Sequence, residues 1–172
     1  MLLILMRHAM AAIRGPWSDA DRPLTADGEV QARQSANGLA CMDLQVAKIF
    51  CSPAVRCRST ADVVAARLGI AAANFQVTGA LSLGTSLANV GDLLQMGGKR
   101  GTILWVGHQP VLERFASTLL LGDGDLPLQL TPAAGLGLHV DLRQDPPVAV
   151  LLWFMRSHEL GMLRGDATSA AD

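Results

Sequence analysis

The sequence predicts an α/β domain built around one mixed sheet. Residues 2–6 and 102–106 are short, uninterrupted apolar runs, a pattern typical of buried strands. Between them, β-rich segments alternate with segments that have helical start and stop signals, which favours strands joined by helices. Residues 136–142 and 148–154 are two further β-rich segments, separated by a turn that contains two prolines. We therefore expect an antiparallel pair late in the chain.

Length and composition favour one compact domain. The chain has 172 residues, of which half are hydrophobic and 17% are charged, so it is long enough and apolar enough to bury a core. We see no internal repeat or linker, and we expect one domain over residues 1–164 with a small, polar, flexible tail over residues 165–172.

Charge and cysteine content exclude several classes of protein. A formal net charge of −1 argues against a protein that coats nucleic acid or an anionic membrane. The apolar start is too short to span a bilayer and lacks the basic flank of a signal peptide. Three cysteines without a Cys-x-x-Cys pair are typical of a reducing compartment, so we expect a cytoplasmic location.

The first half of the chain is expected to hold two strands and two helices. The strands are predicted at residues 2–6 and 44–51, and the helices at residues 25–39 and 54–68. Thr25 is a suitable N-cap, although Gly28 stands where a capping-box glutamate would be. Gly69 is expected to end the second helix.

The second half continues the alternation and ends in the antiparallel pair. We expect a short strand over 75–81, a helix over 87–96, a strand over 102–106, a helix over 111–121 entered through Pro110, and a loop over 122–132. His139 in the late pair and His158 near the tail are expected to be structural or exposed.

Cationic and imidazole side chains follow three of the predicted strands. His8 follows the first apolar strand with Arg7 beside it, and His108 follows the strand over 102–106. Arg56 lies in the first turn of the helix that follows the second strand, where backbone N–H groups favour an anion. Because the ends of parallel strands meet at one edge of a sheet, we expect these four residues to share a cleft.

Two arginines, two histidines and a helix start form a site suited to a dianion. Arginine forks and N–H donors stabilise the non-bridging oxygens of a phosphoryl group during its transfer. A histidine nitrogen in line with phosphorus can attack it and form a covalent intermediate. The neighbouring cations favour neutral imidazole, which is the form that attacks.

Three segments resemble the signatures of a known family. Met6-Arg7-His8-Ala9 resembles the Arg-His-Gly signature of the histidine phosphatase superfamily, whose members include phosphoglycerate mutases and many phosphatases. Residues 52–61, Ser-Pro-Ala-Val-Arg-Cys-Arg-Ser-Thr-Ala, resemble its Ser-Pro-x-x-Arg-x-x-x-Thr-Ala segment, and Gly107-His108 resembles its late Gly-His pair. The short length and Arg22-Pro23-Leu24-Thr25 look most like the SixA branch, the phosphohistidine phosphatases.

The resemblance implies a fold and a role for each residue. The fold would be a three-layer α/β/α domain with a mixed, mostly parallel sheet. His8 would be the nucleophile, Arg7 and Arg56 would bind the phosphoryl oxygens, and His108 would donate a hydrogen bond to them. Arg22 would either reach the phosphate or pair with Asp19 or Asp21. Ala9 departs from the usual glycine, and its methyl group is compatible with the turn only if its backbone dihedral angles are ordinary.

The lack of acidic residues in one interval of the chain bears on the leaving group. Many superfamily members carry an acid between the arginine helix and the second histidine, and this acid protonates an alkoxide. Residues 63–91 contain no Asp or Glu. A phosphohistidine leaves as a less basic imidazole, so this absence favours cleavage of a P–N bond. Glu29 or Asp92 remain as carboxylates that a loop could bring to the site.

We therefore expect a phosphohistidine phosphatase that needs no metal or other cofactor and acts on a phosphohistidine-bearing protein, such as a phosphotransfer domain of a signalling relay. Two alternatives stay open: a phosphatase for small phosphomonoesters, and a non-catalytic module that binds phosphorylated partners.

Overall fold

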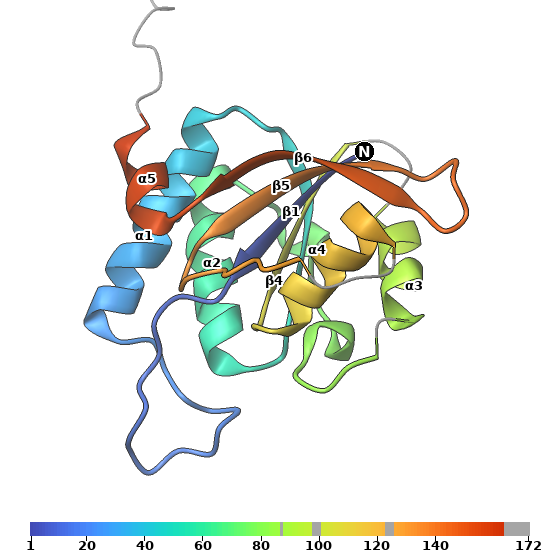
Figure 1. Ribbon diagram of the computed structural model, residues 1–172. Coiled ribbons are helices and arrows are strands. Elements are labelled where there is room, and N and C mark those ends of the chain that lie inside the picture. Colours follow the sequence, from blue (N-terminus) through green and yellow to red (C-terminus); the bar gives the residue numbers. More distant parts are fainter. Residues whose placement is uncertain (87, 98–100, 123–125, 164–172) are drawn as a thin grey trace, which may run out of the picture.

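The strands form one mixed sheet. The structure, a computed structural model, describes residues 1–86, 88–97, 101–122 and 126–163. Within this part, six strands lie in the order β3-β2-β4-β1-β5-β6 (Figure 1). Their bounds are Leu2–Arg7 for β1, Val46–Cys51 for β2, Phe75–Val77 for β3, Thr102–Gly107 for β4, Gly135–Asp141 for β5 and Val148–Met155 for β6.

Strand directions confirm the predicted mixture. Strands β3, β2, β4 and β1 pair in parallel, while β5 pairs antiparallel with β1 and β6 antiparallel with β5. The register places Arg7 of β1 beside Gly107 of β4. His8 and His108 each follow directly, so the two histidines leave adjacent strands at the same edge of the sheet.

Helices cover both faces of the sheet and make the expected three layers. The longer helices are α1 (Ala26–Cys41), α2 (Val55–Leu68), α3 (Ala88–Met96) and α4 (Val111–Leu121), and a short α5 (Ser157–Met162) follows β6. Leu3 and Leu5 of β1 face a core shared with α3 and α4. Ile4 and Met6, which point the other way, face a second core shared with α1 and α2. Figure 1 shows α5 lying beside α1.

Two predictions need correction. The single strand predicted over residues 75–81 is β3 over Phe75–Val77 followed by a 3₁₀ turn over Gly79–Leu81. Thr78 ends the strand because its side chain caps that turn by accepting from the N–H of Ala80 at 3.2 Å. Helix α5 was not predicted, because six residues carry too little helical periodicity. Leu87, where the third helix was predicted to start, and the predicted tail lie outside the described residues.

The N-terminus of α1 fixes the chain that follows β1. Thr25 is the N-cap, as expected, and its hydroxyl accepts from the N–H of Gly28 at 3.0 Å. A Cβ on Gly28 would lie 2.0 Å from the carbonyl oxygen of Met10, so only glycine permits this approach. The segment after His8 is thereby packed against α1. None of the described helices has the length and apolarity to cross a membrane.

Candidate active site

The structure brings the two predicted histidines together. The ring centroids of His8 and His108 lie 5.2 Å apart in an edge-on arrangement. The N–H of His8 donates to the carbonyl of Gly107 at 3.0 Å, so the parallel pairing of β1 with β4 continues up to the site. Two side chains that are 100 residues apart in sequence thus meet because their strands are neighbours.

The hydrogen bonds of His8 fix which of its two ring nitrogens carries the lone pair. Its Nδ1 lies 2.7 Å from the carbonyl oxygen of Ala9, an acceptor only, so the proton belongs on Nδ1. Nε2 then carries a lone pair, and Arg56 Nε donates to it at 3.3 Å. Burial is the main cause that lowers the pKa of His8 to about 4, and the nearby guanidinium groups of Arg56, Arg7 and Arg22 lower it further. The ring is therefore neutral near pH 7.

Arg56 is the most buried charge of the site. Its side chain is 2% exposed, and it lies in the first turn of α2, as predicted. Besides His8, its Nη2 lies 3.4 Å from Nδ1 of His108 and 3.0 Å from a carboxylate oxygen of Asp19. Its Nη1 donates to the backbone carbonyl of Asp19. The guanidinium thus touches both imidazoles.

His108 is oriented by two neighbours. Its Nε2 lies 2.9 Å from the hydroxyl of Ser52, and Arg56 covers its Nδ1. The thiol of Cys57 is 3.4 Å from Nε2 and fully buried. Burial raises the pKa of this thiol to about 12, so Cys57 packs as an un-ionised side chain. Burial, followed by the neighbouring His8 and Arg56, lowers the pKa of His108 to about 4.

Arg7 stands beside the histidines without bonding to either. Its Nη1 donates to the carbonyl of Leu130 at 2.7 Å, and its buried Nε has no partner among the described residues. Burial lowers the pKa of Arg7, and the carboxylate of Glu113 opposes this effect. The Nε of Arg7 is therefore a buried donor without a hydrogen-bond acceptor among the described residues.

Glu113 holds the peptide segment that Arg7 also binds, and it was not among the predicted residues. It is buried in the first turn of α4, and its carboxylate accepts from the N–H of Leu130 at 2.7 Å. Arg7 and Glu113 therefore hold the two sides of one peptide segment at Leu130. A buried acid on a mainly apolar helix was the available signal.

For Arg22 the structure shows the ion-pair alternative. Its Nη2 lies 2.9 Å from one carboxylate oxygen of Asp19, and its Nη1 donates to the carbonyl of Ala12 at 3.2 Å. Asp21 instead accepts from the hydroxyl of Ser18 at 2.6 Å. Arg22 is close enough to lower the pKa values of both imidazoles, so it belongs to the cationic cluster.

A small pocket opens over this cluster. It has a volume of about 210 Å³, and its lining residues are Asp19, Ala20, Ser52, Pro53, Ala54, Arg56, Ser82, Leu83 and His108. Two residues of the interval 63–91, which contains no Asp or Glu, line this pocket: Ser82 and Leu83. Glu29 pairs instead with Arg33, and Asp92 is exposed on α3, so neither lines the pocket.

Asp19 is the one carboxylate among these lining residues. Its hydrogen bond with Arg56 is the largest cause that lowers its pKa, so this group is ionised near pH 7. Nothing in the described part of the chain groups three or more His, Cys, Asp or Glu residues in a way that could hold a metal ion.

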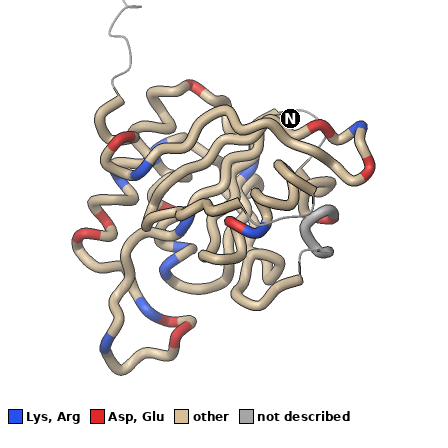
Figure 2. Tube along the Cα trace, viewed as in Figure 1, with Lys and Arg blue, Asp and Glu red and all other residues tan. Residues whose placement is uncertain are grey.

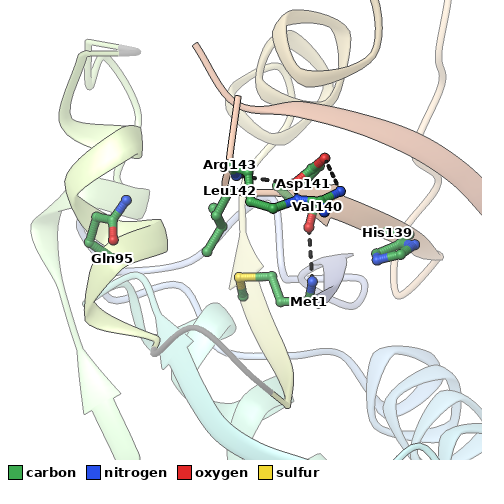
Figure 3. A pocket seen from close by; sticks show the side chains of 7 residues that line it. All are labelled: Met1, Gln95, His139, Val140, Asp141, Leu142 and Arg143. Carbon is green, nitrogen blue, oxygen red and sulfur yellow. Dashed lines mark hydrogen bonds and ion pairs between the residues drawn. The ribbon is translucent and has the colours of Figure 1, made fainter. Parts of the chain in front are cut away.

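A larger cavity lies at the opposite edge of the sheet. It has a volume of about 550 Å³ and is lined by Met1, Gln95 and residues 139–143 (Figure 3). Its charged groups are occupied locally: the amino group of Met1 donates to Val140 at 2.8 Å, and Asp141 pairs with Arg143 at 2.8 Å. His139 is exposed there, as expected, and no second imidazole accompanies it among the lining residues.

Ala9 fits the turn after His8 without strain. Among the described residues, the non-glycine positions with positive φ are Asp43, Gln45 and Ala133, so Ala9 has ordinary dihedral angles. Its methyl group is fully buried in a small cluster with Ala32 and Ala133, and its N–H donates to Thr60 at 3.0 Å. The turn therefore accommodates alanine at this position, because its backbone dihedral angles are ordinary.

Charges elsewhere are sparse and of both signs. Figure 2 shows acidic and basic positions interspersed along the chain, with both kinds close together in the loop that follows β1.

Comparisons with known proteins agree with this geometry. Residues 3–81 match the profile of the Histidine phosphatase superfamily (branch 1). An uncharacterized protein of Picosynechococcus sp. is 36% identical over 141 residues, which cover 80% of this chain and 84% of that relative.

Two solved structures are informative. The protein histidine phosphatase SixA, in complex with tungstate, is 25% identical with a TM-score of 0.83, covering 93% of this chain and 99% of that one. A mycobacterial glucosyl-3-phosphoglycerate phosphatase shares the fold at 15% identity, with a TM-score of 0.63 and coverage of 88% and 96%.

Proposed function

The chain belongs to the histidine phosphatase superfamily and has a SixA-type structure. From this premise we propose that it is a cytoplasmic, metal-independent phosphohistidine phosphatase that acts on a protein. The observation that carries the proposal is the buried guanidinium of Arg56, which contacts Nε2 of a neutral His8 and Nδ1 of His108 beside a small pocket. Many members of this superfamily are phosphatases. The three free thiols, Cys41, Cys51 and Cys57, accord with a reducing compartment.

In the first step, Nε2 of His8 attacks phosphorus and the P–N bond of the substrate breaks. The bond between His8 Nδ1 and Ala9 keeps the attacking lone pair aimed into the site. Arg7 and Arg56 donate to the phosphoryl oxygens, and His108 donates from Nδ1 while its Nε2 accepts from the hydroxyl of Ser52, with Arg22 adding positive charge nearby. These donors stabilise the charge that spreads over the oxygens in the transition state.

In the second step, water attacks the phosphorylated His8 and releases inorganic phosphate. His8 regains its starting form, with the proton on Nδ1, because the carbonyl of Ala9 accepts only from that nitrogen. The same donors serve both steps, since each passes through a similar phosphoryl geometry.

The leaving group decides between a P–N and a P–O bond. Ser82 and Leu83 provide no acid, and the carboxylate of Asp19 is held ionised by Arg56. An alkoxide would leave without a proton from this pocket. A phosphohistidine whose ring is protonated on the other nitrogen leaves as a neutral imidazole, so in that form it needs no acid from the enzyme.

Exposed apolar side chains in the loop that carries Asp19 and in the pocket lining support a protein substrate. Ile13 is 86% exposed and Trp17 is 43% exposed in the loop that carries Asp19, and Leu83 in the pocket lining is 51% exposed. Exposed apolar side chains of this kind suit contact with a partner surface. A free sugar phosphate gains little from them.

Turnover on two substrates tests the proposal. We expect kcat/KM to be higher for a phosphohistidine-bearing protein than for p-nitrophenyl phosphate or a sugar phosphate, with a phosphorylated enzyme trapped in each productive case. A preference for the phosphate esters would support the small-molecule alternative. A failure to trap any phosphoenzyme would support the binding-module alternative.

A variant in the loop that carries Asp19 sharpens this test. Ile13→Asp should lower kcat/KM for the protein substrate by roughly 10-fold, because one apolar contact contributes about 1–2 kcal/mol. It should leave turnover of p-nitrophenyl phosphate unchanged. Val150→Asp is the matched control, since Val150 is 65% exposed and pairs with His139 toward the other edge of the sheet. Equal effects of the two variants on the protein substrate would argue against a contact between Ile13 and that substrate.

A further inference from the structure

The guanidinium of Arg56 uses two different edges. Its Nε and Nη2, which form the side-on edge of the planar group, face Nε2 of His8 and Nδ1 of His108. Its Nη1 and Nη2, which form the end-on edge, face the backbone carbonyl and the carboxylate of Asp19. Because the guanidinium is rigid and planar, fixing one edge fixes the direction of the other.

The side-on edge is the one that a phosphoryl group must use. A group bound between His8 and His108 would take over the N–H donors that now contact the two imidazoles. The end-on edge points away from this position and remains bound to Asp19.

We propose that Asp19 is a positioning residue, which holds the end-on edge of Arg56 so that its side-on edge faces the phosphoryl site. The same carboxylate bonds to Arg22 through its other oxygen at 2.9 Å, so one loop residue orients two cations. This inference rests on the proposed phosphoryl chemistry of the pocket, and it assigns to Asp19 a role in geometry, not in proton transfer.

The loop keeps its place without the carboxylate. The N–H of Val55, the first residue of α2, donates to the carbonyl of Ala20 at 2.9 Å, and the backbone carbonyl of Asp19 itself accepts from Arg56. The side chain of Asp19 is 65% exposed, so its removal leaves no cavity. Substitutions at Asp19 should therefore act on the orientation of Arg56 and leave the fold intact.

Two variants and a control separate orientation from charge. Asp19→Ala removes both carboxylate contacts, whereas Asp19→Asn removes the same charge but keeps one acceptor oxygen. We expect kcat for p-nitrophenyl phosphate or a phosphohistidine protein to fall by roughly 10- to 100-fold in Asp19→Ala, and by less in Asp19→Asn. The loss should appear in kcat more than in KM, because orientation acts on the transition state. Asp21→Ala, in the same loop but bonded to Ser18, should be unaffected.

A direct readout of Arg56 keeps the inference separate from the proposed function. In ¹H–¹⁵N spectra of ¹⁵N-arginine-labelled protein, the Nε–H resonance of Arg56 should be sharp and protected from exchange in the wild type and in Asp21→Ala. It should broaden or exchange faster in Asp19→Ala. An unchanged resonance together with unchanged kcat in Asp19→Ala would overturn the positioning role. An unchanged resonance alone would also overturn it, even if kcat fell. A wild type that turns over no phosphorylated substrate would defeat the proposed function, while the Arg56 resonance would still report on Asp19.

Discussion

The two edges of the sheet each carry a cavity, a histidine and an arginine, yet they differ in what these groups face. At the edge where β1 and β4 end, a pocket of about 210 Å³ holds Arg56 and His108 within reach of His8. At the other edge, a cavity of about 550 Å³ has His139 exposed and Arg143 paired with Asp141. The candidate site is therefore identified by charged and imidazole side chains that face one another, and not by the volume of the cavity.

Burial accounts for the contrast. Arg56 is 2% exposed and its donors point at two imidazoles, whereas the side chain of Arg143 is 88% exposed and bonds within its own strand end. A buried cation interacts strongly with an arriving anion, while an exposed one is screened by water and salt. The opposite edge therefore supplies matched controls for substitutions at the pocket.

The largest effect is expected from the histidines. His8→Ala should abolish phosphate release and phosphoenzyme formation, because no other described nucleophile occupies the position of Nε2. His139→Ala should leave both unchanged. Release of phosphate from a phosphohistidine protein, with a thermal melt to confirm folding, measures the pair. Substantial residual activity in His8→Ala would contradict the nucleophile assignment.

A smaller loss is expected from the arginines. Arg56→Ala should lower kcat by about 10²- to 10³-fold, the usual effect of removing a donor to the transition-state oxygens. Arg56→Lys should recover little of this, since an ammonium group cannot face both imidazoles. Tungstate affinity, measured by calorimetry, should fall in both variants. Arg143→Ala should change neither quantity, and a comparable loss there would remove the distinction between the two edges.

The smallest effect concerns stability against pH. The pKa values of His8 and His108 are lowered from 6.5 to about 4 in the folded protein, so the unfolded chain binds more protons between these values. The free energy of unfolding should therefore rise as the pH increases from about 4 to about 6.5, by about 1–2 kcal/mol for each histidine between pH 5 and 6.5. Urea denaturation across this range measures the slope.

A double variant supplies the control for that slope. Replacing His8 and His108 together by asparagine removes both titrating groups and should flatten the dependence. A slope that survives in the double variant would show that other groups produce it. Activity should likewise stay level down to pH 5, since neutral His8 remains the main form.

Much of the fold was predictable because its signals are local. The apolar runs at β1 and β4, the N-cap at Thr25 and the end of α2 before Gly69 follow from short-range patterns, and the structure has all of them. The alternation of strands and helices was enough to predict the mixed sheet. Helix α5 and the turn after β3 were missed because they are shorter than the period that would reveal them.

The site was predictable only in part, for a physical reason. His8, His108 and Arg56 each stand at the start or end of an element, and sheet topology alone brings such ends together. The contact of Asp19 with Arg56, and that of Glu113 with the peptide held by Arg7, join distant segments of the chain. No periodicity records a contact of that kind. The condition placed on Ala9 was a question about dihedral angles, which only the structure answers.

The pairing of Arg7 with Gly107 has a consequence for the changes that the site tolerates. Since His8 and His108 leave the sheet one residue beyond a register pair, their separation follows from the spacing of adjacent strands, a quantity that point substitutions barely alter. Loops around the pocket can then differ in length and character without moving the two imidazoles.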